Sequence, residues 1–179
     1  MNKKAGFTLL DSLIVIVILG IIGMIIIPQF QGMVQETRLS EAAAEIVSGM
    51  QYAGNLAVRY RRPFGFQADA TGTSRLFSIF DNRSDKTVCT DQVQDDPQMN
   101  TDCVVLNPLD KSWYIRNFAS MENYREVTFA IKRNDVLIPF IIFYPDGHSA
   151  SSDTTVTVGL GSRQKTITVD GMTGRISVQ

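Results

Sequence analysis

The sequence predicts an α+β protein, with a long N-terminal helix packed on an antiparallel β-sheet. Two observations support this prediction. Residues 29–62, which follow a long apolar run at 7–27, keep the three- and four-residue spacing of apolar side chains that is typical of a helix. Residues 127–178 hold short apolar runs separated by turn-forming residues, which is typical of antiparallel strands. Hydrophobic residues make up 44% of the 179-residue chain and charged residues 20%, as expected for a folded protein.

Residues 7–27 form a nearly uninterrupted apolar run. Between Leu13 and Ile27 only two glycines depart from large apolar side chains. A helix of this length is about 30 Å long and matches the hydrocarbon core of a bilayer, so a transmembrane helix is predicted. Lys3 and Lys4 precede it and favour a cytoplasmic N-terminus, with the rest of the chain outside.

An ordinary secretory signal peptide is the main alternative for this segment. Such a peptide has an apolar core of about 7–15 residues followed by small residues at the cleavage site. Here the apolar run is longer and is followed by the sequence PQFQ, while the small residues Ala5 and Gly6 come before it. The pattern therefore favours an anchor that is retained.

Asp11 is the unusual residue of the apolar run. A carboxylate inside a membrane helix costs on the order of 2.5–3.5 kcal/mol, and such residues are usually functional. No basic residue lies between Phe7 and Ile27. Cleavage between Gly6 and Phe7 would create an α-amino group as a partner, in the same chain or a neighbour. A polar pair of this kind sets the register between identical helices.

Residues 3–11 read KKAGFTLLD, which resembles the class III leader of type IV pilins and type II secretion pseudopilins. The resemblance implies that a prepilin peptidase cuts after Gly6 and that Phe7 becomes the N-methylated N-terminus. It also assigns Asp11 to register and assembly. This family normally has glutamate there, so the carboxylate of this chain is one methylene shorter. Pro28 matches a helix-loosening proline that many members carry.

Residues 28–62 continue the helix with an amphipathic pattern and end before Pro63, after arginines that suit the negative end of the helix dipole. A continuous helix over residues 7–62 would be about 80 Å long. The resemblance implies that its first half lies in the membrane or the filament core and that its second half packs on the sheet. The apolar stripe is expected at Leu39, Ala43, Ile46 or Val47, Met50, Ala53 or Gly54, Ala57 and Tyr60.

The remaining chain is predicted to form strands. Pro139 interrupts the most apolar of them and indicates an edge strand, a bulge, or a strand that starts only at Phe140. Turn-forming residues stand at 145–147 and 171–174. Phe118 to Tyr124 is expected to form a turn of helix. The strands are expected at 75–80, 113–115, 127–132, 136–144, 154–160, 166–169 and 175–178.

Residues 84–107 are predicted to form a long acidic surface excursion. Cys89 and Cys103 lie in it, 14 positions apart. Because the topology places both outside the cytoplasm, a disulfide is expected, worth roughly 3 kcal/mol. The alternatives are a metal site, which two thiols far from the single histidine His148 do not make, and a calcium site, for which no EF-hand spacing exists.

Two segments near the C-terminus resemble the GspH/FimT domain: FIIFYPDGHS at 140–149 and ITVDGMTGRI at 167–176. This domain occurs in H-type minor pseudopilins of type II secretion and in minor type IV pilins, some of which bind DNA through basic residues near the C-terminus. Here the tail holds only Arg175, with Arg163 and Lys165 nearby. An H-type pseudopilin is therefore favoured, no nucleic-acid partner is expected, and a FimT-like pilin in pilus assembly or DNA uptake is the alternative.

The resemblance implies four parts: a leader at 1–6, a transmembrane and filament-core helix at 7–27, an amphipathic helix at 28–62, and a periplasmic β-rich domain at 63–179. The implied partners are the other minor pseudopilins, the major pseudopilin, the prepilin peptidase and the inner-membrane assembly platform. The implied location is the bacterial inner membrane and then the pseudopilus, near whose tip the subunit supports export of folded proteins across the outer membrane.

No enzyme is predicted. Asp146, His148 and Ser149 are nearly adjacent turn residues, whereas a catalytic triad needs a spatial constellation. The glycines at 159 and 161 fit a hairpin turn better than a dinucleotide site, which needs a third glycine in register. The sequence therefore predicts no catalytic residue, no cofactor and no bound metal.

Overall fold

The computed structural model describes residues 9–68, 72–82, 104–149 and 152–179, except for the side chains of 25–31. The chain divides into two units within its first helix, residues 1–37 and 38–179, and each unit is described by itself.

Helix α1 begins at Leu9 and ends at Tyr60, and its backbone stays helical through Pro28. In the first unit the large apolar side chains that the structure describes are exposed, with Leu9 at 84% and Met24 at 81%. None of the helices in the described part of the chain combines the length and the hydropathy that a membrane span requires. The transmembrane segment expected over residues 7–27 is therefore not confirmed and stays a prediction.

The end of α1 follows from backbone geometry. Arg61 takes a left-handed conformation, with a φ of 52°, and the N–H of Arg62 donates to the carbonyl of Ala57 over 3.3 Å. Pro63 then prevents further helix, because it has no N–H to donate. The predicted end before Pro63 is confirmed.

The second unit holds a four-stranded antiparallel sheet in the order β3-β2-β1-β6. Its strands are β1 (Phe64–Ala68), β2 (Leu76–Asp81), β3 (Ile115–Asn117) and β6 (Phe140–Phe143). A 3₁₀ helix at Phe118–Ser120 follows β3, within the segment where a turn of helix was predicted.

A five-stranded antiparallel sheet has the order β5-β4-β7-β8-β9. Ser74 and Phe129 exchange two backbone hydrogen bonds, of 2.9 and 2.8 Å, and so link β4 to the chain just before β2. The strands are β4 (Thr128–Arg133), β5 (Val136–Leu137), β7 (Thr154–Leu160), β8 (Arg163–Val169) and β9 (Ile176–Val178).

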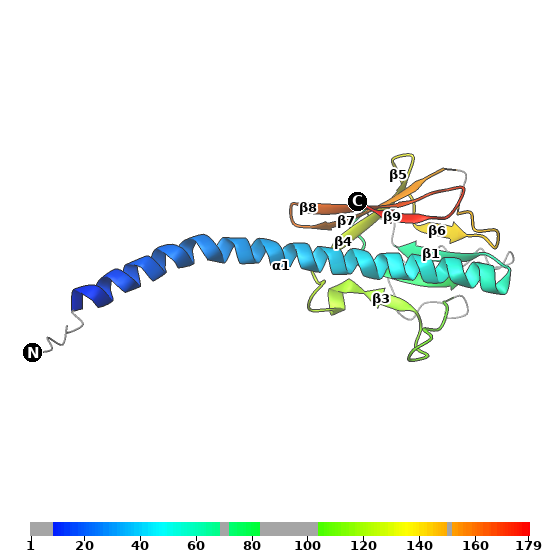
Figure 1. The fold of residues 1–179 in the computed structure, drawn as a ribbon. Helices are drawn as coiled ribbons and strands as arrows, with labels where there is room; N and C mark the ends of the chain where they lie inside the picture. Colours follow the sequence, from blue (N-terminus) through cyan, green and yellow to red (C-terminus); the bar gives the residue numbers. More distant parts are fainter. Residues whose placement is uncertain (1–8, 69–71, 83–103, 150–151) are drawn as a thin grey trace, which may run out of the picture. The chain divides into compact units, whose positions relative to one another are not determined.

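The C-terminal half of α1 lies against both sheets (Figure 1), and one hydrophobic core joins all three elements. Polar contacts at its margin connect the helix to each sheet. Lys165 Nζ on β8 donates to Ser40 Oγ over 2.7 Å, and Arg116 Nε on β3 pairs with Glu45 Oε1 over 3.0 Å. The helix is thus the shared layer beneath two separate sheets.

The predicted apolar stripe of α1 is confirmed at most positions and is wrong at Tyr60, which is 54% exposed. The helix turns Tyr60 out of the core, and Leu56 and Ala42 take up buried positions that the pattern did not select. The confirmed positions are Leu39, Ala43, Ile46, Met50, Ala53 and Ala57.

Strand β1 was not predicted, because all five of its residues are buried and its sequence does not alternate. On its far face the ring of Phe80 lies over Gly65, where a Cβ atom would come within 2.1 Å of the Phe80 Cζ. The apolar run 136–144 was predicted as one strand, but it divides between the two sheets. Of the three options for Pro139, two are confirmed: the strand starts only at Phe140, and it is an edge strand of its sheet.

The predicted surface excursion is wrong at its C-terminal end. The N–H of Val105 donates to the Ile79 carbonyl over 2.8 Å, and Val104 forms a bridge with Phe80. Asn107 is buried at 4% exposure. Residues 104–107 therefore belong to the edge of the four-stranded sheet, while the part from 84 to 103 lies outside the described residues.

Two glycines on α1 make a matched test of this packing. A Cβ on Gly49 would come within 2.8 Å of the buried Phe77 ring, whereas one on Gly54 would stay 3.7 Å from Phe143. Alanine improves helix propensity equally at both positions, so the clash decides the difference. We expect Gly49→Ala to be less stable than Gly54→Ala by about 1–3 kcal/mol, measured by urea denaturation of the full chain. Equal stabilities would contradict the close helix-sheet packing.

Candidate functional site

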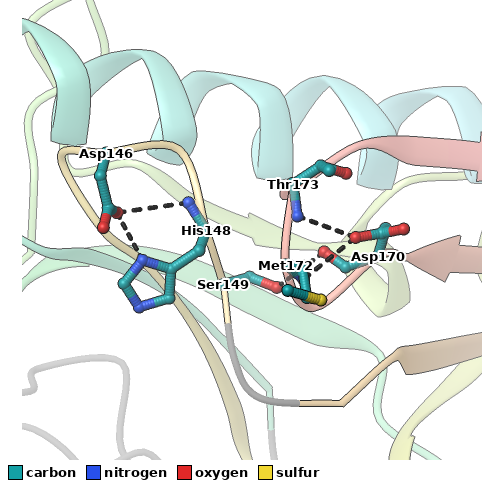
Figure 2. Close-up of polar contacts among 6 residues, drawn as sticks. All are labelled: Asp146, His148, Ser149, Asp170, Met172 and Thr173. Atoms are coloured by element: carbon teal, nitrogen blue, oxygen red, sulfur yellow. Dashed lines mark hydrogen bonds and ion pairs between the residues drawn. The ribbon is translucent and has the colours of Figure 1, made fainter.

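The two segments that carried the C-terminal resemblance form a pair of adjacent turns. We call residues 144–149, which follow β6, and residues 170–175, which connect β8 to β9, the paired turns. Figure 2 shows them beside each other, beneath α1. Both belong to the second unit of the chain.

The first turn is held by its own side chains. Asp146 Oδ1 accepts a hydrogen bond from the His148 ring and another from the His148 N–H over 3.4 Å (Figure 2). The His148 ring stacks on Tyr144, with ring centres 4.3 Å apart and planes 6° from parallel. Gly147 has a φ of 93°, which favours glycine. The turn is therefore rigidly specified by local contacts.

The second turn is organised by Asp170. Its Oδ1 accepts hydrogen bonds from the N–H groups of Thr173 over 2.8 Å and Met172 over 3.0 Å (Figure 2). The bonds from Thr173 are the largest cause that lowers the pKa of Asp170 below its ordinary value, because they favour the ionised carboxylate. This is an Asx-type turn, which the aspartate side chain shapes.

Hydrogen bonds and close backbone packing join the two turns. The N–H of Ser149 donates to the Gly171 carbonyl over 2.9 Å, and the Ser149 hydroxyl donates to the Asp170 carbonyl over 3.3 Å. Gly174 has a φ of 64°, and a Cβ there would come within 2.2 Å of the Gly147 carbonyl oxygen. Glycine at 174 is therefore required both by the backbone conformation and by the neighbouring turn.

The same contacts rule out a catalytic triad at Asp146, His148 and Ser149. His148 and Asp146 are in contact, but Ser149 is buried, at 3% exposure, and its hydroxyl donates to a backbone carbonyl in the second turn. A nucleophile must be reachable by substrate and by its base. Ser149 is therefore not placed as a nucleophile here, and its hydroxyl helps to hold the turn.

A groove of about 380 Å³ opens between α1 and the paired turns. We call it the α1 groove. Apolar side chains of Met50, Val58, Phe143 and Ile176 line it, and none of the described residues that line it is charged. The groove fits an uncharged group of a partner better than an ion.

A second hollow, of about 680 Å³, lies at the C-terminal end of α1 and is lined by Arg59, Arg62 and Lys111. The Arg62 guanidinium pairs with Asp81 over 2.7 Å and lies over the Tyr60 ring, 5.6 Å from its centre. Part of the positive charge in this hollow is therefore compensated within the protein.

The predicted N-terminal site residues belong to the first unit or lie outside the described residues. Asp11 lies in the first turn of α1, in the first unit. Pro28 lies within α1. Gly6, Phe7 and both cysteines, Cys89 and Cys103, lie outside the described residues.

The sequence analysis identified Gly174 as a turn residue but missed its contact with Gly147. It also missed the bond between Lys165 and Ser40. The sequences PDG at 145–147 and TGR at 173–175 indicated the two turns. No local pattern shows that turns some 25 residues apart pack together. The one sequence signal for this contact was the presence of a glycine in each motif, Gly147 and Gly174.

A substitution at Gly174 tests the junction of the paired turns, with Gly161 as the control. Both glycines have positive φ angles, 64° and 60°, so alanine carries a similar backbone cost at each. At Gly161 a Cβ would meet nothing within 4 Å. We expect Gly174→Ala to be less stable than Gly161→Ala by about 1–3 kcal/mol, measured by denaturant unfolding. A larger loss at Gly161 would contradict the close approach.

Comparisons with known proteins agree with this fold. The FimU type IV minor pilin of Pseudomonas aeruginosa has a TM-score of 0.53 at 18% identity, over 80% of this chain and 90% of FimU. The EpsH minor pseudopilin of the Vibrio cholerae type 2 secretion system gives 0.53 at 12% identity, over 79% and 96%. A second EpsH structure gives 0.54 at 9% identity, over 79% and 93%. At these identities the similarity shows the fold alone.

A search of curated proteins finds no match. The family model for the type II transport protein GspH matches residues 42–173, which is well over half of the chain and includes most of both paired turns. The pilin-like α+β fold and the family resemblance expected from the sequence are therefore confirmed. This chain belongs to the GspH family of minor pseudopilins and pilin-like structural subunits.

Proposed function

We propose that this protein is the H-type minor pseudopilin of a type II secretion system, a structural subunit near the tip of the periplasmic pseudopilus that supports export of folded proteins across the outer membrane. The match to the type II transport family carries this proposal. The uncharged α1 groove and the compact paired turns suit contact with other protein subunits.

The electrostatics of the C-terminal region support secretion over DNA uptake. Phosphate contacts supply most non-specific affinity for DNA. In this region Lys165 already donates to Ser40 Oγ, and Arg175 is the only basic residue after Gly174. The formal net charge of the chain is −1. A DNA-binding surface here would rest on very few phosphate contacts.

The N-terminal segment completes the proposal. A prepilin peptidase cleaves between Gly6 and Phe7, and Phe7 is then N-methylated. Residues 7–27 anchor the chain in the inner membrane with the globular domain in the periplasm, and later join the helical core of the pseudopilus. Pro28 loosens α1 in the assembled filament. Cys89 and Cys103 form a disulfide, which the oxidising periplasm permits.

The proposed partners are the major pseudopilin, the other minor pseudopilins and the inner-membrane assembly platform. The fold supports a second candidate, a minor type IV pilin, since the likeness to FimU equals that to EpsH in TM-score. In that case the same surfaces would act in pilus assembly or DNA uptake.

Deletion of the gene in its native host distinguishes the two candidates. We expect several exoproteins to disappear from the culture medium and to accumulate in the periplasm, measured by comparing the proteomes of both fractions with those of the parent strain. Restoration by the wild-type gene is the control. An unchanged set of secreted proteins would reject the secretion role, and a loss of pili or of DNA uptake would then support the pilin alternative.

Asp11→Ala tests the assembly role of the carboxylate. The variant should insert and be cleaved normally, because alanine removes only the polar side chain from an apolar run. It should incorporate poorly into filaments, because the partner amine in the neighbouring subunit loses its carboxylate. Immunoblots of membrane and sheared filament fractions measure both steps, with Asp11→Glu as the matched control. Normal incorporation of Asp11→Ala into filaments would contradict the assembly role proposed for Asp11.

A further inference from the structure

The outer edge of β6 carries backbone groups that point away from its sheet. β6 is the last strand of the four-stranded sheet. The N–H of Ala68 donates to the Pro139 carbonyl over 2.8 Å, and bonded positions alternate along an antiparallel pair. Ile141 therefore bonds to β1, while the N–H and C=O groups of Phe140 and Ile142 face outward. In the described part of the chain, β6 has no strand on that side.

The edge of the other sheet also reaches the α1 groove. β9 is the last strand of the five-stranded sheet, and its Gln179 exchanges two hydrogen bonds with Thr166, of 3.1 and 2.8 Å. By the same alternation, the backbone groups of Ile176 and Val178 face away from β8. Phe143 at the end of β6 and Ile176 at the start of β9 both line the α1 groove.

The chemistry of β6 is unusual for a strand at the edge of a sheet. Natural proteins usually protect such edges with lysines, prolines or bulges, because unpaired N–H and C=O groups recruit other strands. Here Phe140–Phe143 reads FIIF, with no charged residue, and the nearest prolines, Pro139 and Pro145, lie outside the strand. The described residues that line the adjacent groove are also uncharged. The outward N–H and C=O groups of β6 can bond to an extended peptide. Because neither the strand nor the described groove lining carries a charge, an uncharged peptide fits best.

We propose that the β6 edge binds an extended, uncharged and mainly apolar segment of a partner subunit by β-strand addition. Backbone hydrogen bonds to Phe140 and Ile142 hold the segment, and one of its apolar side chains enters the α1 groove beside Gly54. That the partner is a subunit of the same filament rests on the proposed function. The strand-addition site itself rests on the register of β6.

The β5 edge supplies a matched control. The N–H of Ile138 donates to the Ile131 carbonyl over 3.0 Å, so the backbone groups of Leu137 face outward on the far edge of the five-stranded sheet. Leu137 is exposed. Proline at Leu137 or at Ile142 removes one outward N–H and leaves the ladder to the neighbouring strand in place.

The first experiment places a photo-crosslinking amino acid at position 142, 137 or 13 of the full chain in host cells that carry the complete filament genes. We expect cross-links from 142 to a defined filament subunit, none from 137, and cross-links from 13 that report helix packing in the filament. Cross-links from 13 without any from 142 would overturn strand addition. No cross-link from either 13 or 142 would instead reject the filament role.

The second experiment measures amide exchange in the wild-type chain, alone in detergent and in isolated filaments. The amides of Phe140 and Ile142 should become protected by about tenfold or more in filaments, since each gains a hydrogen bond. The Ile141 amide should be protected in both states. Unchanged exchange at 140 and 142 in filaments would overturn the proposal, even with cross-links from 142.

The variants then link the edge to assembly. Ile142→Pro should lower the amount of this subunit in filaments by about tenfold, while Leu137→Pro should leave it unchanged. Protection of the Ile141 amide in Ile142→Pro verifies that β6 still pairs with β1. If Ile142→Pro loses that protection, the variant Ile142→Lys is used in place of Ile142→Pro. Equal incorporation of the β6 variant and the Leu137→Pro control would contradict the inference.

Discussion

The apolar stripe on the C-terminal half of α1 is the constraint on which the rest of the globular unit depends. The sheets are joined to each other at the bridge between Ser74 and Phe129, and both bury their inner faces against this helix. Neither sheet has another layer among the described residues that covers that face. Burial of apolar area is the dominant favourable term in folding. Gly49 shows how closely helix and sheet approach, because the Phe77 ring occupies the space of its absent side chain.

The same architecture explains why the molecule keeps unpaired strand edges. A helix that supports two sheets leaves β6 and β9 as the last strands of their sheets, and the paired turns that follow β6 and precede β9 meet at Gly147 and Gly174. Beyond that contact the α1 groove remains between the edges and the helix. The turns therefore act as a fixed junction, and the groove is a consequence of the way the two sheets are joined.

These features suit a structural subunit. Hydrogen bonds within and between the paired turns hold their shape. The described residues that line the groove are uncharged, with apolar side chains beside the polar Gln51 and Asn55, which suits contact with protein segments. A structural subunit of the GspH family needs surfaces of this kind, because it contacts neighbouring subunits.

The sequence by itself determined the local chemistry of this protein. Apolar spacing predicted α1, alternation predicted β7, and Pro139 indicated an interruption or an edge in the run 136–144, because these signals act within a few residues. The tertiary structure decided what depends on distant neighbours. Strand β1 is buried on both faces, so its sequence has no periodic pattern. Val105 bonds to Ile79 and therefore belongs to the sheet instead of the predicted surface excursion. The close approach of Gly174 to Gly147 exists only because two turns pack together. Contacts of this kind have no period in the sequence, so only the folded chain reveals them.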